Sequence, residues 1–360
     1  MELRGNFRVL FLYDVAEAIA LDVLRAKLQP QGVELRSSSL SSPIPQHLRF
    51  ERPPCVEPAV PIALESGGQA EVTTKYFDYG VVSIELELPF ACDWDSLVLQ
   101  ASRWIGASEL EKRADELLTA ALRRAAPALV KRYKTWLKED YFIVQLREVT
   151  EPGGGTLTAA ELLASRAKEI AQLVRGEAIP LSDAERQEVL QAGISYSSND
   201  LLVLGWSGAL VYGSSEVAEM TMQILEYANT QLLELRYYDG LLTKLLEDVY
   251  RALERKSRAW RLSREAARLN TIRLDVMELT EKVDNAVKFL SDMFYARLYN
   301  LAASKVGVPD YRRLVDQKLR TAGELYRFMV DQFNQTRSFV LELMVVIILV
   351  IELFFLFHPK

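Results

Sequence analysis

The sequence predicts an α+β N-terminal domain followed by long coiled-coil-like helices and one C-terminal transmembrane helix. Residues 1–214 mix strand-like and helix-like segments, which is typical of an α+β cytoplasmic domain. Residues 215–337 contain a single proline and place apolar residues three and four positions apart, which predicts a long helical stalk or bundle. Residues 338–360 are almost wholly apolar before a short tail, which favours a membrane span.

The first part of the α+β domain reads as a strand followed by a helix. Residues 7–13 predict the strand, and Asp14 could cap a helix that runs to about Leu28. The segment from Asp93 to about Leu129 is mainly helical, with a break near Gly106. Further strands are expected at residues 141–146, 200–206 and 209–212, and a further helix at 158–174.

A second strand alternates apolar and polar residues. Residues 82–88 place Val, Ile and Leu on one face, and Ser83, Glu85 and Glu87 on the other. Gly80 marks a turn or bulge before this strand. Because a strand with one buried face leaves its other face in water, we interpret Glu85 and Glu87 as solvated residues without a catalytic role.

Three apolar stripes predict the long helices. The first runs from Leu225 to Leu253 with only Asp239 polar, the second from Leu269 to Met293 and the third from Val315 to Phe333. Each spans about three or four heptads, long enough for a coiled-coil-like seam. A compact helical bundle would give the same pattern, so the sequence alone leaves both arrangements open.

A basic segment separates the first two stripes. If the chain turns back there, this tip could contact anionic lipid at a membrane surface, with an aromatic ring at headgroup depth. One unbroken helix over residues 216–303, or a merely solvated turn, are the alternatives, because the segment lacks glycine and proline. The candidate lipid-contacting residues are Arg255, Lys256, Arg258, Trp260, Arg261 and Arg264.

The C-terminal segment Phe339–Phe357 has the expected length of a membrane span. At ~1.5 Å per residue it extends about 29 Å, close to the roughly 30 Å of a bilayer core. Glu342 and Glu352 would then be intramembrane polar residues, either tolerated near the headgroups, paired in an oligomer or lining a wet path. Basic residues upstream predict a single-pass protein of the inner (plasma) membrane with its N-terminal body in the cytoplasm.

Composition excludes several classes of function. The net charge of −6 gives no support for direct nucleic-acid binding, which usually needs a basic face. The chain has two histidines and two cysteines, so histidine-based catalysis, a disulfide scaffold and a cysteine–zinc site are all disfavoured. We therefore predict no catalytic residues, no metal site and no cofactor, and disfavour a hydrolase or transferase in the α+β domain.

Two C-terminal motifs resemble the end of the "required for meiotic nuclear division" family, a domain of unknown function. Tyr311–Leu325 is similar to its arginine-rich helix, and Leu341–Glu352 to its apolar helix, whose two glutamates match Glu342 and Glu352. Lys75–Ile84 resembles its N-terminal strand motif.

The resemblance spans residues 75–352 and departs from the family pattern at several positions. Val315 and Asp316 stand where Leu-Asn is usual, and Leu343 replaces a tryptophan. The chain thus resembles a divergent, prokaryotic member. The resemblance implies a membrane-anchored homo-oligomer without an enzymatic reaction.

These observations lead to two functional hypotheses. The first is a non-enzymatic, membrane-anchored and self-associating scaffold or tether, whose partners are membrane lipid, other copies of the chain and an unidentified protein. The second is an oligomeric ion channel or transporter in which Glu342 and Glu352 line a pore. Neither hypothesis names a biological process or an oligomer number.

Overall fold

The structure is a computed structural model that describes residues 2–28, 36–37, 52–58, 61–65, 68–150, 157–254, 259–288 and 293–357. These residues fall into two compact units. Unit 1 comprises Met1–Glu234 and Asp284–Pro309, and unit 2 comprises Leu235–Val283 and Asp310–Lys360.

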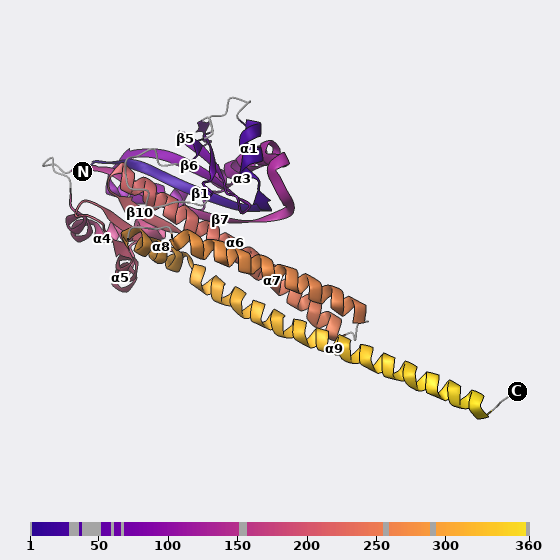
Figure 1. The fold of residues 1–360 in the computed structure, drawn as a ribbon. Helices are drawn as coiled ribbons and strands as arrows, with labels where there is room; N and C mark the ends of the chain where they lie inside the picture. Colours follow the sequence, from indigo (N-terminus) through magenta and orange to yellow (C-terminus); the bar gives the residue numbers. More distant parts are fainter. Residues whose placement is uncertain are drawn as a thin grey trace. The chain divides into compact units, whose positions relative to one another are not determined.

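Unit 1 is built on one ten-stranded sheet (Figure 1). Its strand order is β2-β3-β5-β6-β1-β7-β10-β9-β8, with β4 paired to β5 off this path. Neighbouring strands are antiparallel except for β7 and β10, which are parallel. The strands are β1 (Glu2–Ile19), β2 (Arg36–Ser37), β3 (Cys55–Pro58), β4 (Ile62–Ala63), β5 (Gln69–Tyr76), β6 (Val81–Cys92), β7 (Leu129–Thr150), β8 (Gly193–Ile194), β9 (Leu201–Leu204) and β10 (Gly208–Tyr212).

Helices connect these strands and follow them. Several predicted boundaries are confirmed, including the break at Gly106, whose φ is +71°, and the predicted helix at 158–174, which Thr158 caps. The helices are α1 (Leu21–Leu28), α2 (Trp94–Trp104), α3 (Ser108–Ala125), η2 (Ala126–Ala128), α4 (Ala159–Arg175), α5 (Asp183–Gln191), α6 (Ser215–Glu254), α7 (Ala259–Lys288), α8 (Met293–Val306) and α9 (Val308–Phe357).

The strand β1 lies in the middle of the sheet and is buried on both faces. It pairs with β6 over Leu3–Asp14 and with β7 along most of its length. The prediction that Asp14 caps a helix is wrong, because the strand continues past it to Ile19 and the helix starts only at Leu21. The turn predicted at Gly80 is confirmed: its φ is +99°, and a Cβ there would lie 1.8 Å from the carbonyl oxygen of Ala16.

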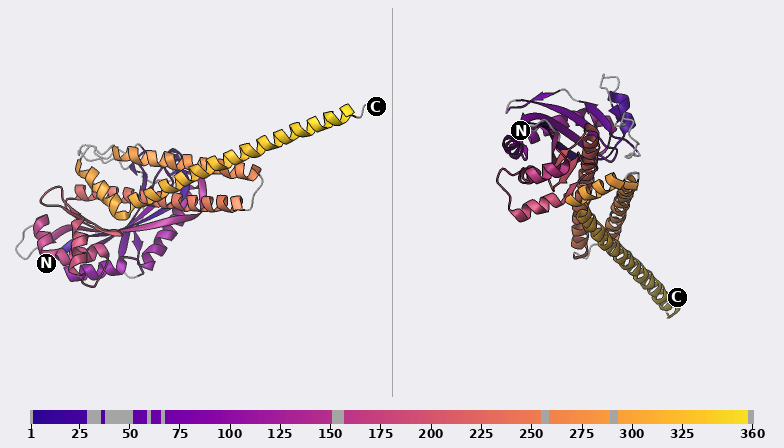
Figure 2. Two further views of the ribbon diagram at one scale, coloured as in Figure 1. Left: turned by 90° about the horizontal axis from the view of Figure 1, so that it is seen from below. Right: turned by 90° about the vertical axis from the view of Figure 1, so that its left-hand side faces the viewer.

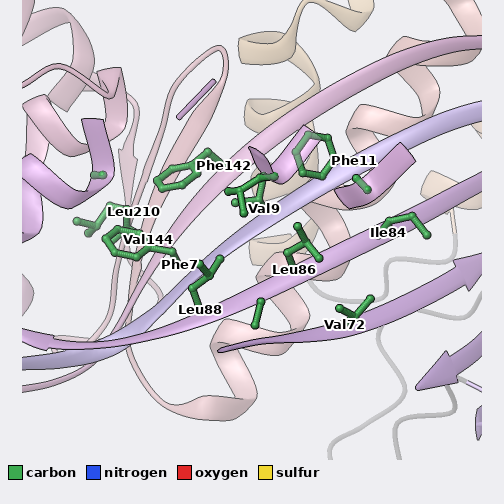
Figure 3. Close-up of a cluster of buried hydrophobic side chains, with 14 of the residues drawn as sticks. Phe7, Val9, Phe11, Val72, Ile84, Leu86, Leu88, Phe142, Val144 and Leu210 are labelled. Carbon is green, nitrogen blue, oxygen red and sulfur yellow. The ribbon is translucent and has the colours of Figure 1, made fainter. Parts of the chain in front are cut away.

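One face of the sheet carries the main apolar core (Figure 3). Phe7, Val9 and Phe11 of β1 lie beside Ile84, Leu86 and Leu88 of β6, as the alternation of residues 82–88 predicts. Apolar residues of α2, α3 and α4 complete the same cluster. Burial of these side chains is the main favourable term for folding this face.

The first part of α6 covers the other face of the sheet. Leu233 joins Leu12, Phe77 and Val81 in a second buried cluster. In unit 1, α8 packs on the same part of α6, where the Tyr299 hydroxyl donates a hydrogen bond to the Gln231 side-chain oxygen. The sheet therefore forms the middle layer of unit 1, with helices on both faces.

Unit 2 contains the second part of α6, α7 and most of α9, which lie side by side (Figures 1 and 2). Arg268 of α7 approaches Asp248 of α6 to 3.7 Å. In one straight helix these residues would be about 30 Å apart, at ~1.5 Å per residue. The chain thus reverses direction between α6 and α7, and the alternative of one unbroken helix over residues 216–303 is wrong.

The one polar residue of the first apolar stripe has a specific partner. The Lys318 ammonium of α9 lies 2.6 Å from the Asp239 carboxylate of α6 and donates to the Thr243 hydroxyl at 2.5 Å. Both charged side chains are about one-quarter exposed. A polar pair at a seam position fixes the register of two helices more than it stabilises them.

The prediction of a C-terminal transmembrane helix is wrong. No helix in the described part of the chain is both long enough and apolar enough to cross a membrane. Phe339–Phe357 forms the end of α9, but Glu342 and Glu352 divide it, and the longest uninterrupted apolar run is Leu343–Ile351. That run is about 14 Å long at ~1.5 Å per residue, half of a bilayer core of roughly 30 Å. The single-pass architecture expected from the sequence is therefore corrected for the described residues.

The Asp239–Lys318 contact should appear as a coupling energy in a double-mutant cycle. We expect Asp239→Leu and Lys318→Met each to lower the free energy of unfolding by about 1 kcal/mol, and the double variant to recover most of the loss. Urea unfolding followed by circular dichroism measures all four proteins. The exposed pair Glu247 and Arg251 on α6 is the control, with an expected coupling below about 0.5 kcal/mol. Equal coupling in both pairs would contradict the assignment.

Candidate functional site

The densest group of charged side chains in unit 1 lies between the sheet and α6. It contains Arg8 of β1, Lys75 of β5, Glu85 of β6 and Glu226 of α6, and we call these four residues the charged network. The prediction that Glu85 and Glu87 are solvated is wrong, because Glu85 is 6% exposed and the Glu87 side chain is only about one-fifth exposed. The polar face of β6 is buried because the first part of α6 lies over it.

The Arg8 guanidinium is bound on several sides. It lies 2.7 Å from the Glu85 carboxylate, and 3.1 Å from each of Glu87 and Glu219. Its Nε donates to the side-chain oxygen of Gln145 on β7 at 3.2 Å. Arg8 thus links three adjacent strands to α6, which a planar group with five N–H donors can do and a lysine cannot.

Lys75 joins the two buried carboxylates of the charged network. Its ammonium lies 3.0 Å from Glu85 and 2.7 Å from Glu226. The other oxygen of Glu226 accepts a hydrogen bond from the Ser83 hydroxyl at 2.6 Å. Each charge in the charged network therefore meets an opposite charge at hydrogen-bond distance, as buried ions require.

Burial and pairing act in opposite directions on the pKa values of the network. Burial alone would raise the pKa of Glu85, but Lys75 and Arg8 outweigh it and lower that pKa to about 2. For Glu226, burial dominates and raises the pKa despite Lys75. The pKa of Lys75 is raised, because the attraction of Glu226 and Glu85 exceeds the effect of burial. Glu85 is thus held as a carboxylate and Lys75 as an ammonium.

This arrangement is suited to holding α6 on the sheet. A general acid or base has to exchange its proton with a reacting group, and a pKa near the working pH favours that exchange. Glu85 and Lys75 are instead fixed in their charged forms by each other. Removing one member would leave a buried charge unpaired, so the charged network acts as a structural clamp with a strict geometry.

Asp14 lies on the same face of β1 and lacks such partners. Its side chain is 1% exposed, and neither carboxylate oxygen has a hydrogen-bond partner in the described part of the chain. Burial raises its pKa to about 8. Sequence analysis missed this group, because a polar residue at a strand end more often caps a helix than enters the core.

The residues predicted as sites are not brought together by the structure. Glu342 and Glu352 are exposed on α9, and Arg264 is exposed on α7. Trp260 and Arg261 lie in the first turn of α7. Arg255, Lys256 and Arg258 lie outside the described residues.

The end of α9 is an exposed apolar surface, which we call the apolar segment (Phe339–Leu353). Its large apolar side chains are between 47% and 65% exposed. In unit 2 it runs on beyond the ends of α6 and α7 (Figures 1 and 2). Contiguous exposed apolar patches of this kind mark interaction sites.

The apolar segment continues the packing seam of α9 in register. Within unit 2, Val315, Ala322 and Met329 are buried at seven-residue intervals. Seven-residue steps from Met329 lead through position 336 to Leu343 and Val350, and the alternate seam positions are Val340 and Ile347. One seam therefore serves two stretches of α9, buried in the first and exposed in the second.

The two glutamates of the apolar segment lie off this seam. Glu342 follows the seam residue Val340 by two positions, and Glu352 follows Val350 by two. Counted in heptads with Val340 at position a, Glu342 is at position c and Glu352 at position f, so both carboxylates lie outside the seam. A helix packed on the seam would leave them in water.

Comparisons with known proteins identify relatives without assigning a function. Residues 4–219 match the family described as "Uncharacterized protein MJ0711, N-terminal domain". The chain is 21% identical over 184 residues to the uncharacterized protein MJ0711 of Methanocaldococcus jannaschii, a match that covers 51% of this chain and 57% of that protein. No solved structure matches the chain. The resemblance to the required-for-meiotic-nuclear-division family is not addressed by these matches and stays a prediction.

Replacing Lys75 tests the charged network. Lys75→Met leaves Glu85 and Glu226 without their shared cation, and we expect it to lower the free energy of unfolding by about 3 to 5 kcal/mol. Arg147→Met is the matched control, because Arg147 contacts Glu87, a carboxylate that also pairs with Arg8 of the network, but is itself 49% exposed. Its expected cost is below about 1 kcal/mol. Equal losses for both variants in urea unfolding would contradict a buried clamp.

Asp14 predicts a specific pH dependence of stability. Its pKa is higher in the folded protein than in the unfolded chain, so folding retains the proton, and stability falls as pH rises towards about 8. Between about pH 6 and pH 8.5, wild type should lose about 2 kcal/mol more than Asp14→Asn. Asp22→Asn, at an exposed position of α1, should keep the wild-type profile. Parallel profiles for wild type and Asp14→Asn would show the group ionised in the folded protein.

Proposed function

The chain belongs to the MJ0711 N-terminal-domain family, and from that premise we propose that it is a non-enzymatic scaffold that associates with further copies of itself. The family match ends at residue 219, before most of α6 and all of α7 and α9. The helices that we propose to self-associate are therefore outside the matched domain. The proposal rests on one observation, the exposed continuation of the α9 seam.

Other copies of α9 suit this surface for a geometric reason. The seam has the four-and-three spacing that lets α-helices pack as a coiled coil, and each copy presents the same spacing. A helix that is apolar all round must be covered on several sides. Met344, Val346 and Ile351 are the apolar positions beside the seam and are exposed as well. We therefore propose a bundle of more than two chains.

The charged network supports a structural role for unit 1. Its ions are used to hold α6 against the sheet, and their pKa values are set by one another. This arrangement favours a unit 1 in which the first part of α6 is held firmly on the sheet. A scaffold needs such a fixed helix. The pore hypothesis required Glu342 and Glu352 to lie within a transmembrane helix, and no helix in the described residues is long and apolar enough to be one.

Substitutions on and off the seam test self-association. Wild type should run as an oligomer in size-exclusion chromatography with light scattering. Leu343→Glu with Ile347→Glu places two charges on the seam and should weaken association at least tenfold, which corresponds to about 1.4 kcal/mol. Leu349→Glu, two positions after Ile347, should have a smaller effect. Circular dichroism checks that each variant remains helical.

Two results would count against the proposal. A monomeric wild type at the highest soluble concentration would remove self-association altogether. A seam variant that associates as well as wild type would show that another surface is responsible.

A further inference from the structure

A second site lies on the apolar face of the sheet in unit 1, on the side opposite the charged network. A pocket of about 490 Å³ opens there between the β4–β5 hairpin and the junction of α2 and α3. Phe7 and Leu88 line it from the sheet, and Trp104 from the end of α2. Pockets that hold small molecules have volumes of this size and a largely apolar lining.

The walls of the pocket are fixed by contacts within the fold. The Glu109 carboxylate at the start of α3 accepts a hydrogen bond from the backbone N–H of Glu65, next to the β4–β5 turn. The turn itself closes with a hydrogen bond from the Leu64 N–H to the Gly68 carbonyl at 3.1 Å. On the other side, the Ala107 N–H donates to the Trp104 carbonyl at 3.1 Å. The pocket is thus formed before any ligand arrives, which reduces the entropic cost of binding.

Three polar side chains at the pocket have unused donors. Arg103 lies in the last turn of α2, with Gln100 one turn before it, and Gln69 begins β5. Within the described part of the chain, no hydrogen bond or ion pair engages the side chains of these three residues. Arg8 and Lys75 differ from them, because their donors are bound to carboxylates of the fold. The three pocket side chains still have donors that a ligand could use.

We propose that this pocket binds a small aromatic carboxylate. The planar guanidinium of Arg103 matches a carboxylate, to which it can donate two parallel N–H bonds. The amides of Gln69 and Gln100 can donate to the same group. The partly exposed ring of Trp104 offers a surface to the body of the ligand, since aromatic rings pack well offset or edge to face. A compact, strongly hydrated anion would leave these apolar surfaces uncovered.

Isothermal titration calorimetry with matched probes tests this proposal on the full chain. The probe is naphthalene-2-carboxylate, with the neutral naphthalene-2-carboxamide and inorganic phosphate as comparisons. Wild type should bind the carboxylate at least tenfold more tightly than the carboxamide, and phosphate weakly or not at all. Arg103→Gln should remove the preference for the carboxylate while leaving carboxamide binding unchanged.

Control variants separate this site from other apolar surfaces. Arg113→Gln changes an arginine of α3 that pairs with Glu116 and does not line the pocket, so binding should stay as in wild type. Leu343→Glu with Ile347→Glu alters the apolar segment and should also leave binding unchanged, which keeps this test independent of self-association. Absence of binding by wild type, or equal binding by Arg103→Gln, would overturn the proposal.

Discussion

The structure of unit 1 depends on the burial of charges between its sheet and α6. Arg8 and Lys75 lie opposite Glu85 and Glu226 with water largely removed. Removing water from an ion costs several kcal/mol, which only close and complete pairing can offset. The clamp therefore tolerates little displacement of α6 along the sheet, whereas the apolar core on the other face could adjust by repacking. The charged network fixes the position of α6 on one face of the sheet. On the other face, burial of apolar area supplies most of the stability.

Polar groups that hold the fold together differ from polar groups that could bind a ligand. In the charged network, every ion has a partner, and Glu85 has a pKa displaced far from neutrality. At the pocket beside Trp104, the donors of Arg103, Gln69 and Gln100 are unengaged within the described chain and lie next to apolar side chains. Arg103 and Gln69 are exposed and Gln100 is partly buried, so their donors are accessible to a ligand that enters the pocket. Binding chemistry is therefore expected at the weakly charged pocket and not at the strongly charged network.

The sequence predicted much of the secondary structure but not which surfaces meet. The alternation at residues 82–88 correctly separated the two faces of β6, but a period of two cannot show that α6 covers the polar face over Glu85. Asp239 stood out as the one polar residue in its stripe, yet its partner Lys318 lies 79 residues away and is identified only once the helices are placed. The span expected at residues 338–360 counted total apolar content and gave too little weight to the two glutamates, which shorten the uninterrupted run.

The position of those glutamates bears on what α9 contacts. If water alone surrounded the end of α9, nothing would favour keeping Val340, Leu343, Ile347 and Val350 in heptad register with the buried seam of unit 2. If apolar surroundings enclosed the helix evenly, Glu342 and Glu352 would be costly at any position around it. A packed seam with both carboxylates outside it accounts for both features. The arrangement is that of a helix whose neighbours cover the seam and the apolar positions beside it, and other copies of α9 present the matching heptad spacing for this contact.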